Sequence, residues 1–214
     1  MSELYNDWIE NWLILKRRKF SLKYYLKKSS IQYADCIDNA VSAGVAIVNN
    51  NKFVVLAINK NYKMGTIGLV EGEKITLSFE YATKYKLPII CFVASAGIRI
   101  QEGTLALMQM AKMGAAVKLH NNRKLLFISI VQNPSLGGAS ASFVSLADVI
   151  IAEKNSIYGF AGKRIVEKTT FECLPSNFQS SEYSKAHGLV DIVVDDSETK
   201  NTILTLLKLH SKRR

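Results

Sequence analysis

The chain has 214 residues and a net charge of +10, from 28 Lys and Arg against 18 Asp and Glu. Much of the basic excess lies at 16–28 and 208–214, without the aromatic-basic pattern of RNA-recognition modules, so the pattern argues against nucleic acid as the main ligand. No apolar run reaches the roughly 18 residues of a membrane span, and the first residues lack a signal-peptide pattern, which predicts a cytoplasmic protein without a membrane partner.

Residues 1–34 form an N-terminal arm that differs in composition from the rest of the chain. Trp8, Ile9, Trp12 and the leucines that follow have helical spacing, and a basic segment comes next. Two interpretations stay open at this point. The arm is either a helix that packs on the main body or a docking segment for a partner protein.

Residues 35–214 alternate between strand and helix patterns and form one predicted domain. The predicted strands are a hairpin over 43–48 and 52–58, then 87–94, 125–131, 148–152 and 189–194. The predicted helices cover 71–86, 102–119, 137–146, 163–170, 180–187 and 197–210. This alternation predicts an α/β fold with largely parallel strands and with helices on the faces of the sheet.

Two turns rich in small residues follow buried apolar strands and precede helices. One is Ser95-Ala96-Gly97, and the other includes Gly137 and Gly138. The first N–H groups of a helix have no partner inside it, so two neighbouring turns could direct N–H donors at one oxyanion. The sequence therefore predicts a site in which the backbone carries much of the chemistry.

Motifs for other kinds of chemistry are absent. The three cysteines and three histidines are isolated, and G-x-S-x-G, phosphate-loop and dinucleotide motifs do not occur. A glycine-rich loop at 64–74 contains Gly65 and Gly68, which a tight turn explains as well as a ligand does.

Five segments carry a family resemblance: MGTIGLVEGEKIT, LPIICFVASAGIRIQEGTLALMQMAK, NPSLGGASASFVSLADVIIAE, IYGFAGKRIVEKT and LPSNFQSSEYSKAHGLVDIVV. Together and in this order they resemble the carboxyltransferase β subunit of bacterial acetyl-CoA carboxylase, and the resemblance runs from about residue 35 onwards. That resemblance implies the crotonase/ClpP-like α/β fold, a spiral of repeated β-β-α units with two roughly perpendicular sheets.

The resemblance also implies an enzyme activity: transfer of a carboxyl group from carboxybiotin to acetyl-CoA or a related acyl thioester, which gives malonyl-CoA. Biotin would be carried by a separate biotin carboxyl carrier protein, and its freed nitrogen would serve as base. A homologous carboxyltransferase α-like subunit would supply the biotin side of the site. The family's zinc ribbon has four cysteines that this chain lacks, so no zinc is expected.

Carried over by position, the resemblance assigns two groups of site residues. The expected backbone N–H donors are Ala96, Gly97, Gly137 and Gly138. The expected acyl-CoA-binding residues are Gly65, Thr66, Gly68, Arg99, Phe160, Gly162 and Arg164. For Arg99, the alternatives are a role in orienting the turn, a contact with a CoA phosphate, or a salt bridge to Glu102 or another carboxylate. For Phe160, the alternative is a place in the core.

Two departures from the family pattern affect the predicted function. Met64 and Ala96 stand where the family has glycines, and a side chain disfavours positive φ and narrows the approach to the backbone. Three functions therefore stay open: the carboxyltransferase, a malonyl-thioester decarboxylase of the same fold, and a non-catalytic paralogue or scaffold partner.

Overall fold

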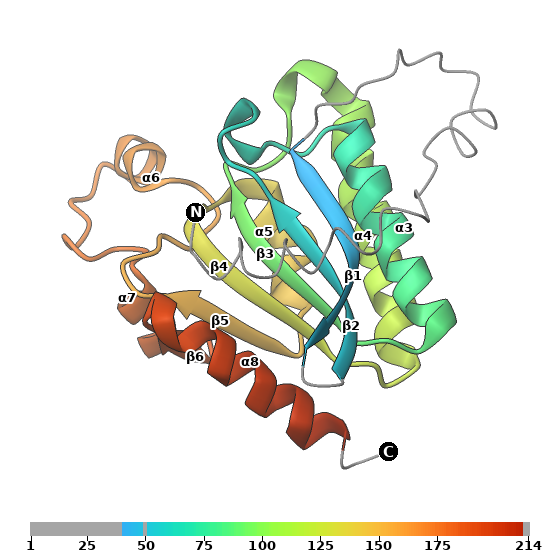
Figure 1. Ribbon diagram of the computed structural model, residues 1–214. Coiled ribbons are helices and arrows are strands. Elements are labelled where there is room, and N and C mark those ends of the chain that lie inside the picture. Colours follow the sequence, from blue (N-terminus) through green and yellow to red (C-terminus); the bar gives the residue numbers. More distant parts are fainter. Residues whose placement is uncertain (1–39, 49–50, 212–214) are drawn as a thin grey trace.

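The computed structural model describes residues 40–48 and 51–211 (Figure 1). The predicted N-terminal arm, residues 1–34, lies outside the described residues. The described part forms an α/β structure around one six-stranded sheet, in which the strands follow one another in chain order from β1 to β6.

The strands agree with the predicted hairpin and the predicted parallel arrangement. They are β1 (Val41–Val48), β2 (Asn51–Ile58), β3 (Ile89–Ser95), β4 (Phe127–Ser135), β5 (Val149–Glu153) and β6 (Ile192–Val194). Strands β1 and β2 pair antiparallel, and every later neighbouring pair is parallel. The carboxyl ends of β2 to β6 therefore lie along one edge of the sheet.

The helices are α3 (Leu69–Tyr85), α4 (Gly103–Asn122), α5 (Gly137–Ser142), α6 (Lys163–Thr170), α7 (Ser181–Ala186) and α8 (Asp196–Ser211). Helices α3 and α4 lie side by side on one face of the sheet, and α8 lies on the other (Figure 1). Short 3₁₀ turns occur at Lys63–Gly65, Ile100–Glu102 and Val144–Leu146.

Two buried clusters, one on each face of the sheet, form the core. Alternate residues of a strand point to opposite faces, so Cys91 packs with Phe79 of α3 in one cluster, and Phe92 packs with Ile203 of α8 in the other. The sheet is buried on both faces, which explains why its central strands are continuous apolar runs in the sequence.

Two expectations about elements need correction. Strand β4 continues to Ser135, four residues beyond the predicted end, because Ser135 still pairs with Ser95. The helix predicted over 137–146 ends at Ser142 and becomes a 3₁₀ turn, which brings Phe143 and Val144 into the core.

The second sheet implied by the family resemblance is not formed by regular strands within residues 40–48 and 51–211. Isolated bridges take its place, between Ile67 and Ile98, Ser135 and Tyr158, and Ile157 and Ser180. Ser135 is the last residue of β4, and the other bridged residues lie in connections between secondary-structure elements. The bridges nevertheless tie the loops at the carboxyl edge of the sheet to one another.

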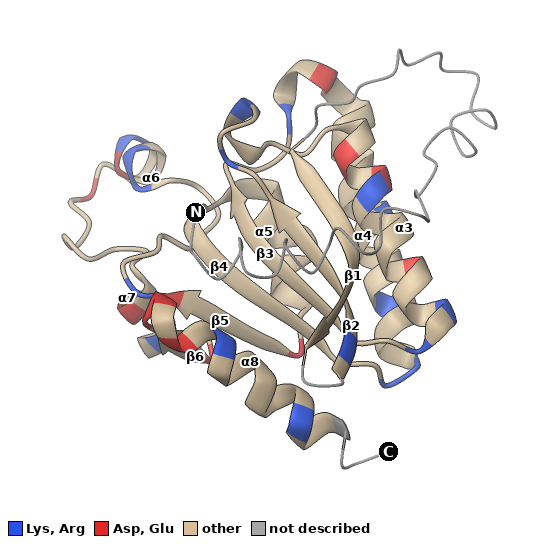
Figure 2. Cartoon of the chain, viewed as in Figure 1, with Lys and Arg blue, Asp and Glu red and all other residues tan. Residues whose placement is uncertain are grey.

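The charged residues of the described part are spread over several elements (Figure 2). Acidic residues gather where α7 and α8 begin, and basic residues occur on α3, α4, α6 and α8 (Figure 2). Within the described residues, no helix combines the length and apolar character that crossing a membrane requires.

Candidate functional site

The two small-residue turns are direct neighbours at the carboxyl edge of the sheet. A Cβ atom on Gly97 would lie 3.1 Å from the nitrogen of Gly138 and 3.2 Å from the Cα of Gly137. The N–H of Leu136 also donates to the carbonyl of Ser95 at 2.9 Å. The prediction that the turns share one place in the fold is therefore confirmed.

The four predicted N–H donors differ in whether they have a partner. Ala96 donates to the carbonyl of Met64 at 3.1 Å, and Gly97 donates to the Ser95 hydroxyl at 3.1 Å. Gly137 donates to the carbonyl of Phe160 at 2.9 Å. Among the described residues, Gly138 is the one member of the four whose N–H has no acceptor within hydrogen-bond reach. Of the four expected N–H donors, only that of Gly138 is available to a ligand among the described residues, because the other three N–H groups already donate to acceptors within the protein.

Two serines that the sequence analysis did not single out belong to this region. The Ser95 hydroxyl donates to the carbonyl of Gly65 at 2.7 Å while it accepts from Gly97, so it joins the two loops. Ser140, in the first turns of α5, is buried, and its Oγ has no partner among the described residues. A buried hydroxyl without a partner is costly, so Ser140 is an unsatisfied polar group within α5.

The loop before α3 approaches the end of β3 closely. Gly65 has φ of +65°, and a Cβ atom there would overlap the carbonyl oxygen of Ala94, so this position requires glycine. Met64, which stands where the family has glycine, keeps the left-handed conformation with φ of 55° and is exposed. Ala96 has a negative φ, so its methyl group introduces no backbone strain.

Arg99 is buried and forms ion pairs, which is the salt-bridge alternative of the sequence analysis. Its guanidinium lies 2.7 Å from a carboxylate oxygen of Glu71 and 2.7 Å from one of Glu102, and it also donates to the carbonyl of Thr66 at 2.8 Å. Burial lowers the pKa of Arg99, but the hydrogen bonds and charges of Glu71 and Glu102 outweigh burial. The pKa of Arg99 is therefore raised above its ordinary value. A guanidinium held in this way orients the loops around it.

Glu102 lies directly before α4 but does not cap that helix. Its side chain makes no capping bond to α4 and instead accepts the N–H of Leu69, the first residue of α3, at 2.6 Å. Burial raises the pKa of the Glu71 carboxyl, but hydrogen bonds from Arg99 and from backbone N–H groups outweigh burial, so the pKa is lowered. Both carboxylates near the turns are held in ion pairs with Arg99 and hydrogen bonds to backbone N–H groups, so they are poorly suited to act as a general base.

The three remaining predicted residues follow the bridge at Tyr158. Phe160 is 64% exposed, so the alternative place in the core is wrong, and its carbonyl accepts the N–H of Gly137. Gly162 precedes α6 and lies beside Leu136, with 4.0 Å between a Cβ atom built on Gly162 and a methyl carbon of Leu136. Arg164 is exposed on α6. The structure thus brings Phe160 and Gly162 to the second turn and leaves Arg164 in solvent.

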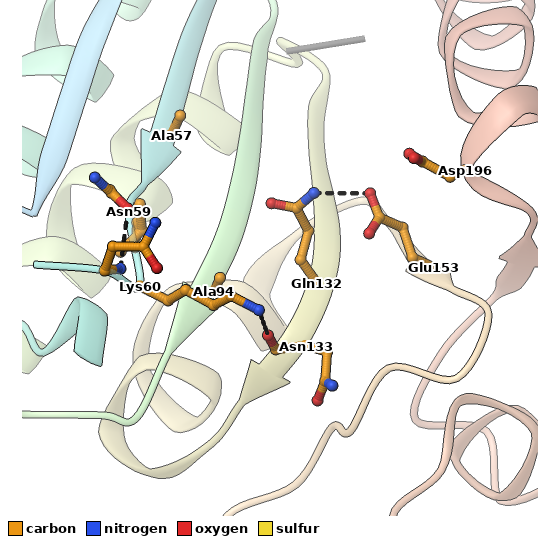
Figure 3. A pocket seen from close by; sticks show the side chains of 10 residues that line it. Ala57, Asn59, Lys60, Ala94, Gln132, Asn133, Glu153 and Asp196 are labelled. Carbon is orange, nitrogen blue, oxygen red and sulfur yellow. Dashed lines mark hydrogen bonds between the residues drawn. The ribbon is translucent and has the colours of Figure 1, made fainter. Parts of the chain in front are cut away.

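A polar pocket of about 250 Å³ opens at the same edge of the sheet, on the face that carries α8 (Figure 3). Its lining includes Ala94 and Asn133, which come shortly before the two turns, and none of the eleven predicted site residues. Gln132 donates to Glu153 at 2.8 Å, and Lys60 donates to the carbonyl of Asn133 at 3.0 Å (Figure 3). Burial raises the pKa of Glu153, and nearby Asp196 adds to this effect although the Gln132 hydrogen bond opposes it.

The described residues contain no cluster of side chains that could bind a metal ion. Within residues 40–48 and 51–211, no three side chains of His, Cys, Asp or Glu gather in a way that could hold an ion. Cys91 is buried, and burial raises the pKa of its thiol well above the ordinary value, which disfavours the reactive thiolate.

The single largely parallel sheet, its covering helices and the paired turns at its carboxyl edge define a crotonase-like α/β fold, the fold of known carboxyltransferases. Residues 12–212 match the model of the carboxyl transferase domain, and the chain belongs to that family.

Three solved structures illustrate the likeness. The Pseudomonas malonate decarboxylase MdcD–MdcE hetero-dimer has a TM-score of 0.72 at 20% identity, covering 84% of this chain and 81% of that chain. Transcarboxylase 12S with hydrolysed methylmalonyl-coenzyme A has a TM-score of 0.69 at 26% identity, and the match covers 79% of this chain and 33% of the transcarboxylase chain. The β subunit of P. aeruginosa geranyl-CoA carboxylase has a TM-score of 0.69 at 17% identity, and the match covers 79% of this chain and 32% of the β subunit.

Proposed function

We propose that this chain is a carboxyltransferase β-like subunit that acts in the cytoplasm on acetyl-CoA or a related acyl thioester and gives malonyl-CoA or its counterpart. The observation that carries the proposal is the unpartnered N–H of Gly138 beside the Gly97 turn, in a member of the carboxyl transferase family. A carboxyltransferase α-like subunit and a biotin carboxyl carrier protein would complete the enzyme.

The proposed chemistry depends on charge stabilisation by the backbone. When the α-carbon of an acyl thioester loses a proton, negative charge develops on the thioester oxygen, and a pre-oriented N–H donor stabilises that charge. Gly138 can supply this donor. Carboxybiotin, carried by the separate protein, would supply the carboxyl group. Gly65 and Gly68 would lie beside the thioester, and the exposed Phe160 would lie at the rim.

A second function has support of its own. The malonate decarboxylase subunit is covered over 81% of its length, whereas transcarboxylase 12S is covered over 33%. Decarboxylation of a malonyl thioester also passes through an enolate, so the same donor would serve this reaction. This alternative requires no transfer of the carboxyl group to biotin.

The test is co-expression with a homologous α-like subunit, followed by malonyl-CoA-dependent transfer of the carboxyl group to free biotin. The carboxyltransferase proposal predicts consumption of malonyl-CoA that depends on biotin. Consumption at the same rate without biotin would establish the decarboxylase instead. A stable complex without either reaction would identify the chain as a non-catalytic partner.

A further inference from the structure

The ion pairs of Arg99 are part of a larger set of contacts between the loop before α3 and the start of α4. Each carboxylate uses one oxygen for Arg99 and the other for a backbone N–H of the loop. Glu71 accepts from Gly68 at 3.0 Å, and Glu102 accepts from Leu69 at 2.6 Å. Arg99 itself also contacts both the hydroxyl and the carbonyl of Thr66.

These contacts leave no space for a side chain at residue 68. A Cβ atom on Gly68 would lie 2.6 Å from Nη1 of Arg99 and would overlap the carboxylate of Glu102. Gly68 is therefore needed for the close approach of the charged groups to the loop backbone, whether or not a ligand binds there.

The loop held by these charges is hydrogen-bonded directly to the first turn. Ile67 donates to the carbonyl of Gly97 at 2.9 Å, and the N–H of Arg99 donates to the carbonyl of Ile67 at 2.8 Å. The Ser95 hydroxyl and the N–H of Ala96 add bonds from the turn to Gly65 and Met64. A displacement of the loop would therefore displace the Gly97 turn, which touches Gly138.

We propose that Arg99, Glu71 and Glu102 form a positioning clamp that fixes the loop at 65–69 against the turn at 95–99. The clamp holds the acyl-thioester side of the site in register with the backbone donor, and in this respect it rests on the proposed function. The three residues position backbone groups and do not touch the substrate. Arg99 and Glu71 are buried and Glu102 is partly buried, and all three are paired. They suit this role because a charged hydrogen-bonding network has few alternative arrangements of comparable energy.

The test measures amide hydrogen exchange in Glu71→Gln and Glu102→Gln, with Glu73→Gln as the matched control. Glu73 pairs with Lys112 and also joins α3 to α4, and the hydrogen bonds of the loop described above do not involve it. Loss of a hydrogen bond to a charged group should speed exchange at Ile67, Gly68 and Leu69 about 10- to 100-fold, while the amides of β4 stay protected. The control should leave all of these amides unchanged.

Glu102→Gln decides the test if Glu71→Gln fails to fold, because the Glu102 side chain is 28% exposed and its replacement leaves less charge buried. Exchange that stays unchanged in Glu102→Gln, or rises equally in β4, would overturn the clamp. In the co-expressed complex, turnover should fall in the clamp variants and not in the control. Because exchange requires no turnover, an inactive wild type would contradict the proposed function while leaving the test of the clamp intact.

Discussion

Replacement of Gly138 by alanine tests the close packing around the proposed donor. The new Cβ atom would lie 2.3 Å from Cγ1 of Ile98, 3.2 Å from its Cδ1 and 3.1 Å from Sδ of Met110. Carbon atoms in ordinary contact are about 3.5–4.0 Å apart, so Ile98 or the start of α5 must move by roughly 1.2–1.7 Å. The sulfur of Met110 is at the end of a flexible side chain and can adapt more easily.

The movement should lower both stability and rate. Overpacking typically costs about 1–3 kcal/mol, and loss of one oxyanion donor typically costs about 10²- to 10³-fold in rate. We expect Gly138→Ala to unfold at lower urea concentration and to show a carboxyl-transfer rate reduced within that range. Gly138→Val, with two further methyl groups, should be affected more strongly.

A double-mutant cycle with Ile98→Ala identifies the cause, because removal of Cγ1 and Cδ1 opens the space that the new methyl group needs. The two changes should couple favourably by about 1–3 kcal/mol. Gly114→Ala is the matched control: its Cβ atom would lie 3.8 Å from Leu146, an ordinary contact, and helical alanine should stabilise by about 0.5–1 kcal/mol. Additive effects in the cycle, or full turnover by folded Gly138→Ala, would refute the reasoning.

Four further predictions follow from individual residues. Met64→Gly should raise the free energy of unfolding by up to about 1 kcal/mol. The backbone strain of a side chain in the left-handed conformation, about 1–2 kcal/mol, is removed, and this exceeds the cost of the more flexible unfolded chain, about 0.4–1 kcal/mol. Met108→Gly, at an exposed position of helix α4, should instead lower the free energy of unfolding in the same urea titration. Ala96→Gly should leave carboxyl transfer equal or faster if the chain is a carboxyltransferase, and a clear loss in the assay would count against the family assignment of this turn. The lowered pKa of Glu71 means that its stabilisation is present above its unfolded pKa and is lost as pH falls through the folded value, so the stability difference between wild type and Glu71→Gln should shrink below about pH 4.5; a constant difference from pH 6 to 3 would contradict this. Elemental analysis should find no stoichiometric zinc, and one zinc per chain would refute the prediction.

The sequence predicted the elements well where periodicity decides them. The buried strand at 89–95 is a continuous apolar run because both faces of the sheet are covered, and α6 matches its predicted bounds. Helix α5 was predicted too long because Phe143 and Val144 fit a helical pattern, although tertiary packing turns them into the core through a 3₁₀ turn.

The position of the two turns was predicted, but their hydrogen bonds were not. Small residues after two strands correctly located the turns, yet the acceptors of the Ala96 and Gly137 N–H groups come from loops distant in sequence. The partner of Arg99 in α3, Glu71, lies 28 residues away, and no local pattern indicates it. The one available signal was the pairing of Gly68 with Glu71, three residues apart at a helix start, which is typical of a capping arrangement.

The central claim is that the N–H of Gly138 stabilises charge on an acyl thioester. A crystal structure of the co-expressed complex with acetyl-CoA tests it most directly, through the distance from the Gly138 nitrogen to the thioester oxygen. The account predicts about 2.7–3.1 Å, the range of an oxyanion donor. A thioester oxygen bound elsewhere, with the N–H of Gly138 still unpartnered or bonded within the protein, would contradict it.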